Sequence, residues 1–171
     1  LSLHSTKMFH TVEGGALVFR DADIFKEAKK MINFGIGDEG IERLGVNYKL
    51  SEIHAAFGLA NLEQINEIIE QKRYIYEFYK NKLSDHVVFQ NIDNDLEWNY
   101  AYCPILLESE TKTIELLSAL EAGKVFARRY FYPSLNTLNF LSPEDDCPVS
   151  NDIASRILCL PSYVGLEDRD L

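Results

Sequence analysis

The chain has 171 residues, 46% of them hydrophobic, enough for one domain or a substantial part of a larger protein with a packed core. Its 17 basic and 27 acidic residues leave a net charge of −10, the wrong sign for a nucleic-acid backbone or an anionic membrane surface. The sequence lacks an apolar run near the ~20 residues that span a bilayer and a basic-then-apolar start, which favours a cytoplasmic protein.

The segment SLHSTKMFHTVEGG, residues 2–15, sets Lys7 among hydroxyl and imidazole side chains, with no acidic residue before Glu13. After it, the apolar stretch 16–20 predicts a buried strand, and Asp21 is placed to cap a helix over residues 23–35. Residues 35–49 carry four glycines and predict an irregular loop of the kind that often holds binding groups.

Ser51 is expected to cap a long helix through residue 84, whose first half is apolar nearly all round. We therefore expect that half to be buried on several sides, consistent with a subunit contact. Strands are then predicted at 86–90 and 100–107, followed by a helix at 111–123 that Gly123 closes. After these come a strand-like run at 125–133, a short helix at 151–157 that Ser150 caps, and an extended exit at 158–166. Strands that alternate with helices indicate an α/β or α+β domain.

The three cysteines, Cys103, Cys147 and Cys159, are widely separated and lack the spacing of metal ligands. They predict buried or idle thiols and no metal site. The chain opens on Leu1 and stops at GLEDRDL, where an acidic first turn begins a helix that is not continued. These ends favour a fragment of a longer protein.

Four separated segments carry a resemblance to one family: SLHSTKMFHTVEGGALV, GVNYKLSEIHAAFGLANLEQI, RRYFYPSL and ILCLPSYVGLEDRDL. Their order and spacing resemble the sugar aminotransferases of the DegT/DnrJ/EryC1/StrS type, enzymes that use pyridoxal 5′-phosphate. The resemblance covers essentially the whole chain. It implies that the chain is an α/β fragment of a fold type I (aspartate-aminotransferase-like) enzyme. Residues 1–48 would be the end of the large cofactor-binding domain, 49–84 a long connecting helix, and 85–171 an incomplete smaller α/β domain.

The resemblance also implies roles for residues of the cofactor site. Lys7 corresponds to the lysine that forms the internal aldimine with pyridoxal phosphate, and Ser2 to a hydroxyl that hydrogen-bonds the cofactor phosphate. Asn47 corresponds to an asparagine that reaches the same phosphate from the neighbouring subunit, which implies a homodimer with shared active sites. The family's aspartate partner of the pyridinium ring lies upstream of Leu1.

The residue types suit this chemistry. An imine forms only from a neutral amine, and a loop rich in hydroxyls and poor in acids permits a lysine to lose its proton. Once displaced by the substrate amine, the same lysine can move a proton between cofactor and substrate. Taken without the resemblance, Lys7 is an ordinary solvated loop lysine, Asn47 is an Asx residue of a turn, and His4 and His10 are loop hydrogen-bonders.

Substrate contacts rest on weaker correspondences. Lys49 occupies a basic position on the sugar-nucleotide side of the family's pocket, and Tyr130 and Tyr132 lie where the family lines that pocket. A cation can pair with a diphosphate, and tyrosine rings offer apolar faces to a deoxysugar. Aromatic runs of this kind are also common in protein cores.

The wording H-x-T-K-x-F-x-T-V-E-G-G resembles enzymes that make amino-dideoxy sugars on thymidine diphosphate carriers for surface polysaccharides such as O-antigen. It implies transfer of an amino group, with L-glutamate as donor, to give a 4-amino-4,6-dideoxyglucose; the alternative product is a 3-amino-3,6-dideoxyhexose. A sister group replaces the lysine with histidine and performs dehydration, and Lys7 argues against it. For the isolated chain, an inactive folding or dimerisation module is the remaining alternative.

Overall fold

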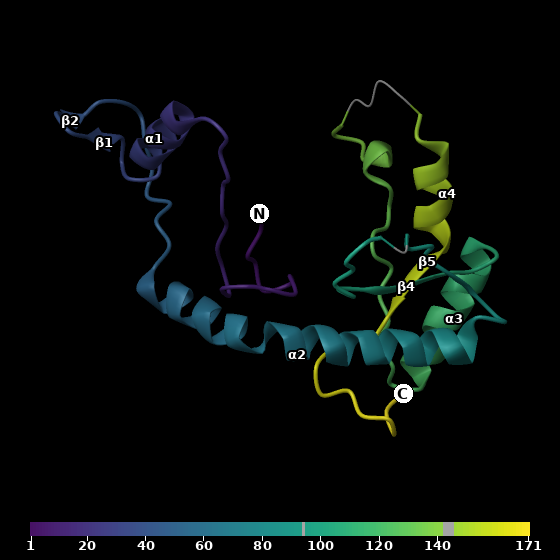
Figure 1. The fold of residues 1–171 in the computed structure, drawn as a ribbon. Coiled ribbons are helices and arrows are strands. Elements are labelled where there is room, and N and C mark those ends of the chain that lie inside the picture. The colour runs from purple at the N-terminus through teal and green to yellow at the C-terminus, as the bar shows by residue number, and fades with distance from the viewer. Residues whose placement is uncertain (94, 142–145) are drawn as a thin grey trace. The chain divides into compact units, whose positions relative to one another are not determined.

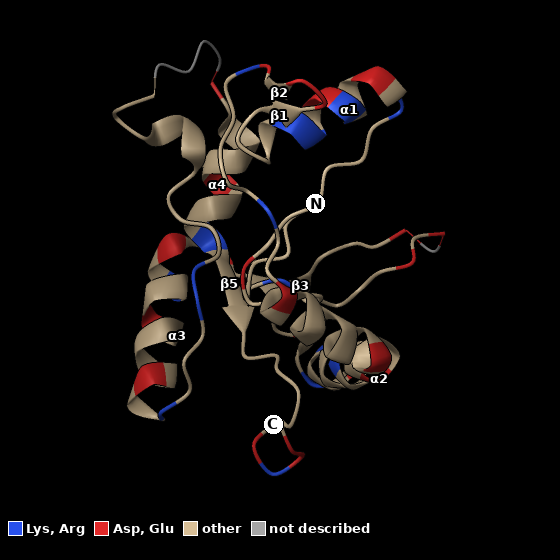
Figure 2. Cartoon of the chain, turned by 90° about the vertical axis from the view of Figure 1, so that its left-hand side faces the viewer, with Lys and Arg blue, Asp and Glu red and all other residues tan. Residues whose placement is uncertain are grey.

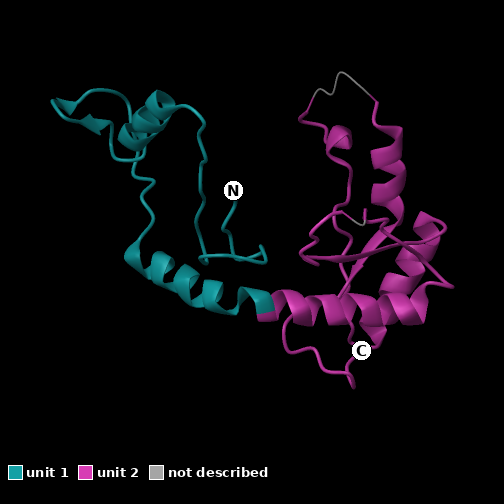
Figure 3. Cartoon of the chain, viewed as in Figure 1, with its two compact units in different colours: residues 1–66 teal, residues 67–171 magenta. Residues whose placement is uncertain are grey.

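The computed structural model describes residues 1–93, 95–141 and 146–171 (Figure 1). These residues form two compact units, Leu1–Asn66 and Glu67–Leu171, coloured separately in Figure 3. The long helix α2, Glu52–Leu83, contributes its first half to one unit and its second half to the other. The mixture of helices with strands confirms the predicted α/β class.

In the first unit, α1 spans Ala22–Met31 and begins where the sequence predicts a helix. The carboxylate of Asp21 caps it, because Oδ1 accepts hydrogen bonds from the backbone N–H of Asp23 at 2.8 Å and of Ile24 at 3.0 Å. Such a cap satisfies donors that the first turn of a helix leaves unpaired. These bonds, chiefly the one from Ile24, hold the pKa of Asp21 below its ordinary value.

A short antiparallel hairpin, β1 (Ile36–Gly37) and β2 (Gly40–Ile41), forms inside the stretch that the sequence predicts as irregular. Ion pairs join it to α1: Lys30 Nζ lies 2.6 Å from Glu42 Oε2 and 3.2 Å from Glu27 Oε1, and Arg43 also pairs with Glu27. Figure 2 shows acidic and basic residues mixed along α1. The charges of this region are therefore matched locally.

The strand predicted at residues 16–20 is wrong. Leu17 and Val18 are 72% and 84% exposed, and the neighbouring backbone makes a single bridge between Ser2 and Gly15. A strand needs a hydrogen-bonded neighbour along its length. Leu1 hydrogen-bonds with Ala16 at the start of the segment, but among the described residues no strand pairs with residues 17–20. The apolar composition was therefore insufficient to predict a strand here.

Helix α2 begins after Ser51 as predicted, and Ser51 Oγ accepts a hydrogen bond from the backbone N–H of His54 at 3.3 Å. The predicted burial of its first half on several sides is wrong within this chain, since Ile53 and Leu59 are 81% and 66% exposed. Apolar side chains lie on nearly all faces of the first half of α2, whereas other residues of the chain pack against only some of these faces.

The second unit is built on a three-stranded antiparallel sheet with the order β3–β4–β5; Figure 1 labels β4 and β5. The strands span Val88–Phe89, Cys103–Leu106 and Ile157–Leu160. Residues Cys103 to Leu106 pair in register with Leu160 to Ile157. Alternate side chains of β4 enter the core, which contains Tyr76, Cys103, Ile105, Leu158 and Leu160. This alternation is the pattern of a strand with one buried face.

Two helices and a 3₁₀ turn complete the second unit: α3 (Glu110–Ala122), α4 (Pro148–Arg156) and Leu135–Thr137. Gly123 closes α3 as predicted. The predicted cap at Ser150 is wrong, because α4 begins two residues earlier: Pro148 occupies the first turn, where its missing N–H costs nothing.

The strand-like run 125–133 is also wrong, because in the described part of the chain it makes a single bridge, from Arg128 to Cys159. Residues 157–160 form β5, which includes the start of the predicted extended exit 158–166, and turns follow through residue 171. None of the helices in the described ranges is both long enough and apolar enough to cross a membrane.

Lys72 on α2 is a buried cation of the second unit. Its Nζ donates to the backbone oxygens of Ser162 at 2.7 Å and Ala101 at 3.3 Å, and lies 3.3 Å from Ser162 Oγ. Burial lowers its pKa. Tyr79 adds a hydrogen bond to the carbonyl of Pro161 at 3.1 Å. The second half of α2 is thereby tied to the segments that precede β4 and follow β5.

We expect the free energy of unfolding of the second unit to fall as the pH rises above 9.0. Burial raises the pKa of the Cys103 thiol from 9.0 to about 12. Between these values the unfolded chain loses a proton that the folded chain keeps, so the unfolded state is favoured. Tyr76 acts in the same direction, because burial raises its pKa to about 12.

Denaturant unfolding at a series of pH values on both sides of 9.0 measures this effect. The Cys103→Ala variant should lose free energy of unfolding less steeply over the same range, whatever its stability at neutral pH. Equal slopes in the two proteins would contradict the assignment to Cys103.

Candidate active site

Residues 2–15 form a loop whose ends are joined by backbone hydrogen bonds. Ser2 and Gly15 form an antiparallel bridge, Leu3 N donates to Gly14 O at 2.9 Å, and Thr11 N donates to Leu3 O at 2.9 Å. We call residues 2–15 the lysine loop. Lys7 lies between the two joined ends, and its backbone N–H donates to His4 O at 2.9 Å. The backbone that carries Lys7 is thus held by local turns.

The polar side chains near Lys7 in the sequence contact one another and, among the described residues, do not contact its Nζ. His4 Nδ1 lies 2.9 Å from Thr6 Oγ1, and His4 Nε2 lies 3.4 Å from Glu13 Oε1. Among the described residues no carboxylate or hydrogen-bond acceptor contacts Lys7 Nζ, and the side chain is exposed. His10 accepts from the backbone N–H of Val12 at 3.3 Å, so both histidines are loop hydrogen-bonders as predicted.

Thr11 is the buried residue of the lysine loop. Its Oγ1 donates to the carbonyl oxygen of Glu13 at 2.7 Å, and only 4% of the residue is exposed. The next residue, Val12, has a φ of 67°, a conformation that β-branched residues rarely adopt. Gly14 follows, where any Cβ would overlap Thr11 Oγ1. The sharp reversal after Lys7 therefore depends on a small set of close contacts.

Asn47 lies in a second segment of the first unit. Its backbone forms an antiparallel bridge with Asn33, the residue two positions after the end of α1. Two glycines allow this arrangement: Gly35 has a φ of 75° and its Cα faces the Arg43 carbonyl, and Gly45 packs on the Gly35 backbone. A Cβ at either position would overlap backbone atoms. The backbone of Asn47 is therefore fixed, whereas its side-chain amide makes no hydrogen bond to the described residues.

Lys49 lies two residues further on and is held near Asn33. Its Nζ donates to Asn33 Oδ1 at 3.2 Å and lies 4.2 Å from the centroid of the Phe34 ring. The side chain is exposed, and no carboxylate among the described residues pairs with it. The Lys49 amino group is therefore accessible to an anionic ligand.

The two tyrosines predicted to line the substrate pocket belong to the second unit. Tyr130 Oη accepts a hydrogen bond from Arg128 Nη1 at 2.8 Å. The Arg129 guanidinium lies 3.5 Å from the centroid of the Tyr132 ring and pairs with Glu110 at 2.8 Å. No role for Arg129 was predicted from the sequence. The available signal was the arginine pair Arg128–Arg129 directly before the aromatic residues of RRYFYP.

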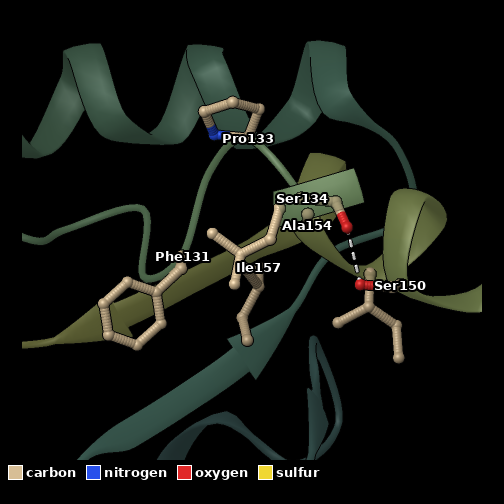
Figure 4. Close-up of a pocket in the computed structure, with 8 residues that line it drawn as sticks. Phe131, Pro133, Ser134, Ser150, Ala154 and Ile157 are labelled. Carbon is tan, nitrogen blue, oxygen red and sulfur yellow. Dashed lines mark hydrogen bonds between the residues drawn. The ribbon is translucent and has the colours of Figure 1, made fainter. Parts of the chain in front are cut away.

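A pocket of about 300 Å³ opens beside this segment (Figure 4). Its lining is mostly apolar, with Ala154 from α4 and with Phe131 and Pro133 from residues 128–133, which we call the tyrosine segment. The two serines of the lining, Ser134 and Ser150, hydrogen-bond to each other at 2.7 Å. Tyr130 and Tyr132 are not among the lining residues.

The structure therefore groups the predicted residues in two sets. Ser2 and Lys7 share one loop, with Asn47 and Lys49 on another segment of the same unit. The tyrosines belong to Glu67–Leu171. The first set presents amine, hydroxyl and amide groups on backbone that is fixed by hydrogen bonds.

Residues 1–171 match the DegT/DnrJ/EryC1/StrS aminotransferase family. The chain belongs to this family. Similar relatives include a dTDP-4-amino-4,6-dideoxy-D-glucose transaminase of Shigella dysenteriae, 37% identical over 97% of the chain and 47% of the relative. The chain thus spans about half the length of the curated relatives it matches.

Solved structures share the fold of this chain. The aminotransferase TlmJ from Streptoalloteichus hindustanus matches with a TM-score of 0.90 at 22% identity, over 99% of this chain and 47% of that one. DesI, solved in the presence of its TDP-sugar product, matches with a TM-score of 0.86 at 31% identity, over 99% and 45%. The expected family and fold are confirmed.

The first unit of this DegT/DnrJ/EryC1/StrS chain fits part of a pyridoxal-phosphate site. Lys7 supplies an amine without an acidic partner, and Ser2 Oγ and the Asn47 amide supply uncharged donors of the kind that bind phosphate. The carboxylate nearest in sequence, Glu13, faces His4. Both features suit a lysine that must react as a neutral amine.

We expect Gly35→Ala to disrupt the segment that carries Asn47, because its Cβ would overlap the Arg43 carbonyl oxygen. Overpacking of this kind costs about 1–3 kcal/mol. Gly40→Ala is the matched control: its φ of 111° is also unfavourable for alanine, yet no atom lies within 4 Å of the added Cβ. Hydrogen exchange at the Phe34 and Val46 amides measures the effect.

Exchange should accelerate more in Gly35→Ala than in Gly40→Ala. Equal acceleration would show that backbone angle alone, and not the close approach of residues 35 and 43, determines this turn.

Proposed function

We propose that the whole protein transfers an amino group from L-glutamate to a 4-keto-6-deoxy sugar on thymidine diphosphate, with pyridoxal 5′-phosphate as cofactor. The product would be a dTDP-4-amino-4,6-dideoxyglucose for surface polysaccharide such as O-antigen, made in the cytoplasm. The observation that carries the proposal is the exposed Lys7 amine, without an acidic partner among the described residues, on a backbone held at both ends of its loop. The family and the named activity of the Shigella relative support it.

Each cofactor residue is given a defined task in this proposal. Lys7 bonds covalently to the cofactor and, when released, moves a proton to or from the substrate carbon that bears nitrogen. Ser2 donates its hydroxyl hydrogen to a phosphate oxygen. Asn47 does the same through its amide from the neighbouring subunit, so the active protein is a homodimer with shared sites. When bound, the cofactor supplies the electron sink that acidifies this carbon.

Three residues are proposed to contact the substrate: Lys49, Tyr130 and Tyr132. Lys49 pairs with the diphosphate through its ammonium, whose contacts among the described residues are both with neutral groups, Asn33 Oδ1 and the Phe34 ring. Tyr130 and Tyr132 present ring faces to the deoxysugar, with their rings oriented by Arg128 and Arg129. The proposed domain division assigns the lysine loop and Lys49 to different sides of residue 48, the end of the large domain.

The exposed apolar side chains on the first half of α2 support the homodimer. Ile53, Leu59 and Leu62 are each more than half exposed, and apolar residues of this density suit a subunit contact. The same observation favours a second candidate for the isolated chain, an inactive dimerisation module. Addition of pyridoxal phosphate to the purified chain distinguishes them, since an inactive module gives no absorption band from a lysine–cofactor bond.

Lys7 is expected to carry the cofactor. Borohydride reduction of the full-length protein with bound pyridoxal phosphate should fix the label on the peptide that contains Lys7, as read by mass spectrometry. Lys7→Arg should abolish labelling and transamination, whereas Lys26→Arg, an exposed lysine of α1 paired with Asp23, should change neither. A label on another lysine would rule out this role for Lys7.

Lys49→Ala should weaken binding of the nucleotide sugar and leave the cofactor spectrum intact. The loss of a charge-assisted contact corresponds to about 1–3 kcal/mol. The measurement is the affinity of the full-length protein for thymidine diphosphate sugars, with activity assayed on the 3-keto and 4-keto forms. Unchanged affinity removes Lys49 from the site, and activity on the 3-keto sugar alone selects the 3-amino-3,6-dideoxyhexose as product.

A further inference from the structure

The first half of α2 contacts the lysine loop at residues 9–11. Asn61 Nδ2 donates a hydrogen bond to the carbonyl oxygen of His10 at 3.0 Å. The His10 ring lies 5.4 Å from the ring of Phe57, centroid to centroid. One turn of α2 thus meets the end of the lysine loop that returns from Lys7.

Gly58 is the closest point of this contact. A Cβ at Gly58 would lie 2.7 Å from Thr11 Cγ2, 3.8 Å from Thr11 Cβ and 3.9 Å from Phe9 Cζ. The first distance is too short for two carbon atoms, whereas the others are ordinary contacts. Glycine inside a helix is about 1 kcal/mol less favourable than alanine. Its presence here is explained by the approach of the Thr11 methyl group.

The contact acts on the closure of the lysine loop. Thr11 N donates to Leu3 O at 2.9 Å, which joins the two ends of the loop around Lys7. Thr11 Oγ1 donates to Glu13 O and so holds the reversal that follows. A displacement of Thr11 away from α2 would therefore shift the hydrogen-bonded ends of the lysine loop, and with them the turn that carries Lys7.

We propose that Gly58 and Asn61 are positioning residues for Lys7. Gly58 lets α2 approach the Thr11 methyl group, and Asn61 fixes the His10 carbonyl, so together they set where the lysine loop presents its amine. This proposal rests on the proposed function, in which Lys7 bonds to the cofactor and transfers a proton. Proton transfer is sensitive to position, and a misplacement of about 1 Å can lower a rate about 10²-fold.

The steric part of the proposal has a direct rescue test. Gly58→Ala in the full-length protein should lower kcat about 10- to 100-fold and slow the borohydride-trapped labelling of Lys7 by pyridoxal phosphate. The KM values for nucleotide sugar and glutamate should stay near those of the wild type. Thr11→Ser removes only Cγ2, the atom that a Gly58→Ala side chain would meet, and keeps the hydroxyl.

The double variant Thr11→Ser/Gly58→Ala should therefore recover the kcat and labelling rate of Thr11→Ser alone. A purely structural effect of alanine on the helix would not be reversed by a change at residue 11. If the double variant is as impaired as Gly58→Ala, the steric contact is not what positions the lysine loop, and this part of the proposal fails.

The hydrogen-bonding part is tested with an isosteric pair. Asn61→Asp keeps the shape of the side chain but removes the donor to His10 O, and should lower kcat and Lys7 labelling while leaving KM unchanged. Asn66→Asp is the matched control, because it introduces the same charge at an exposed asparagine of the same helix. Circular dichroism of both variants verifies that α2 is intact.

The outcomes separate this proposal from the proposed function. If the wild-type protein neither labels at Lys7 nor transaminates, the proposed function fails. If the wild type labels at Lys7 and is active, and Gly58→Ala and Asn61→Asp behave as Asn66→Asp does, the proposed function stands and the positioning role is wrong. Selective loss in kcat and labelling, with rescue by Thr11→Ser, supports it.

Discussion

The arrangement of the first unit depends on the burial of one small side chain, Thr11. Its backbone N–H holds Leu3, its hydroxyl holds the carbonyl of Glu13, and its methyl group faces Gly58. A threonine supplies both the polar group and the small apolar group that these neighbours require. A larger residue would collide with the helix, and an apolar one would leave the Glu13 carbonyl without this donor. The conformation on either side of Lys7 follows from this one residue.

In the second unit a half-buried arginine, Arg129, has a comparable structural role. Arg129 Nη2 donates to Glu110 at 2.8 Å and to the backbone oxygen of Ser155 at 2.9 Å, so it joins α3, the tyrosine segment and the end of α4. The hydrogen bond from Arg129 holds the pKa of Glu110 below its ordinary value. The guanidinium plane also supports the Tyr132 ring. A single arginine thus gives an irregular segment a defined shape without a strand partner.

Features that depend on interactions between residues close in the sequence were predictable, whereas features that depend on distant residues were not. Helix starts at Asp21 and Ser51 were predicted correctly because a cap acts within three or four residues. The strand at residues 16–20 was wrong because strand formation depends on partners that composition does not reveal. The role of Lys7 is predicted from the resemblance. The hydrogen bond from Asn61 to His10, in contrast, joins residues 51 positions apart and leaves no local pattern. Gly58, a glycine inside the first half of the long helix, was a readable sign of that contact.

The burial of Lys72 bears on chemical selectivity. A lowered pKa makes its amine easier to deprotonate, and a neutral amine is the form that attacks carbonyl compounds. Yet its nitrogen is surrounded by the oxygens of Ala101 and Ser162 and is shielded from solvent. An aldehyde in solution therefore meets Lys7 on an open loop and cannot reach Lys72 in the folded second unit. Access, more than intrinsic basicity, decides which of these two amines an aldehyde finds.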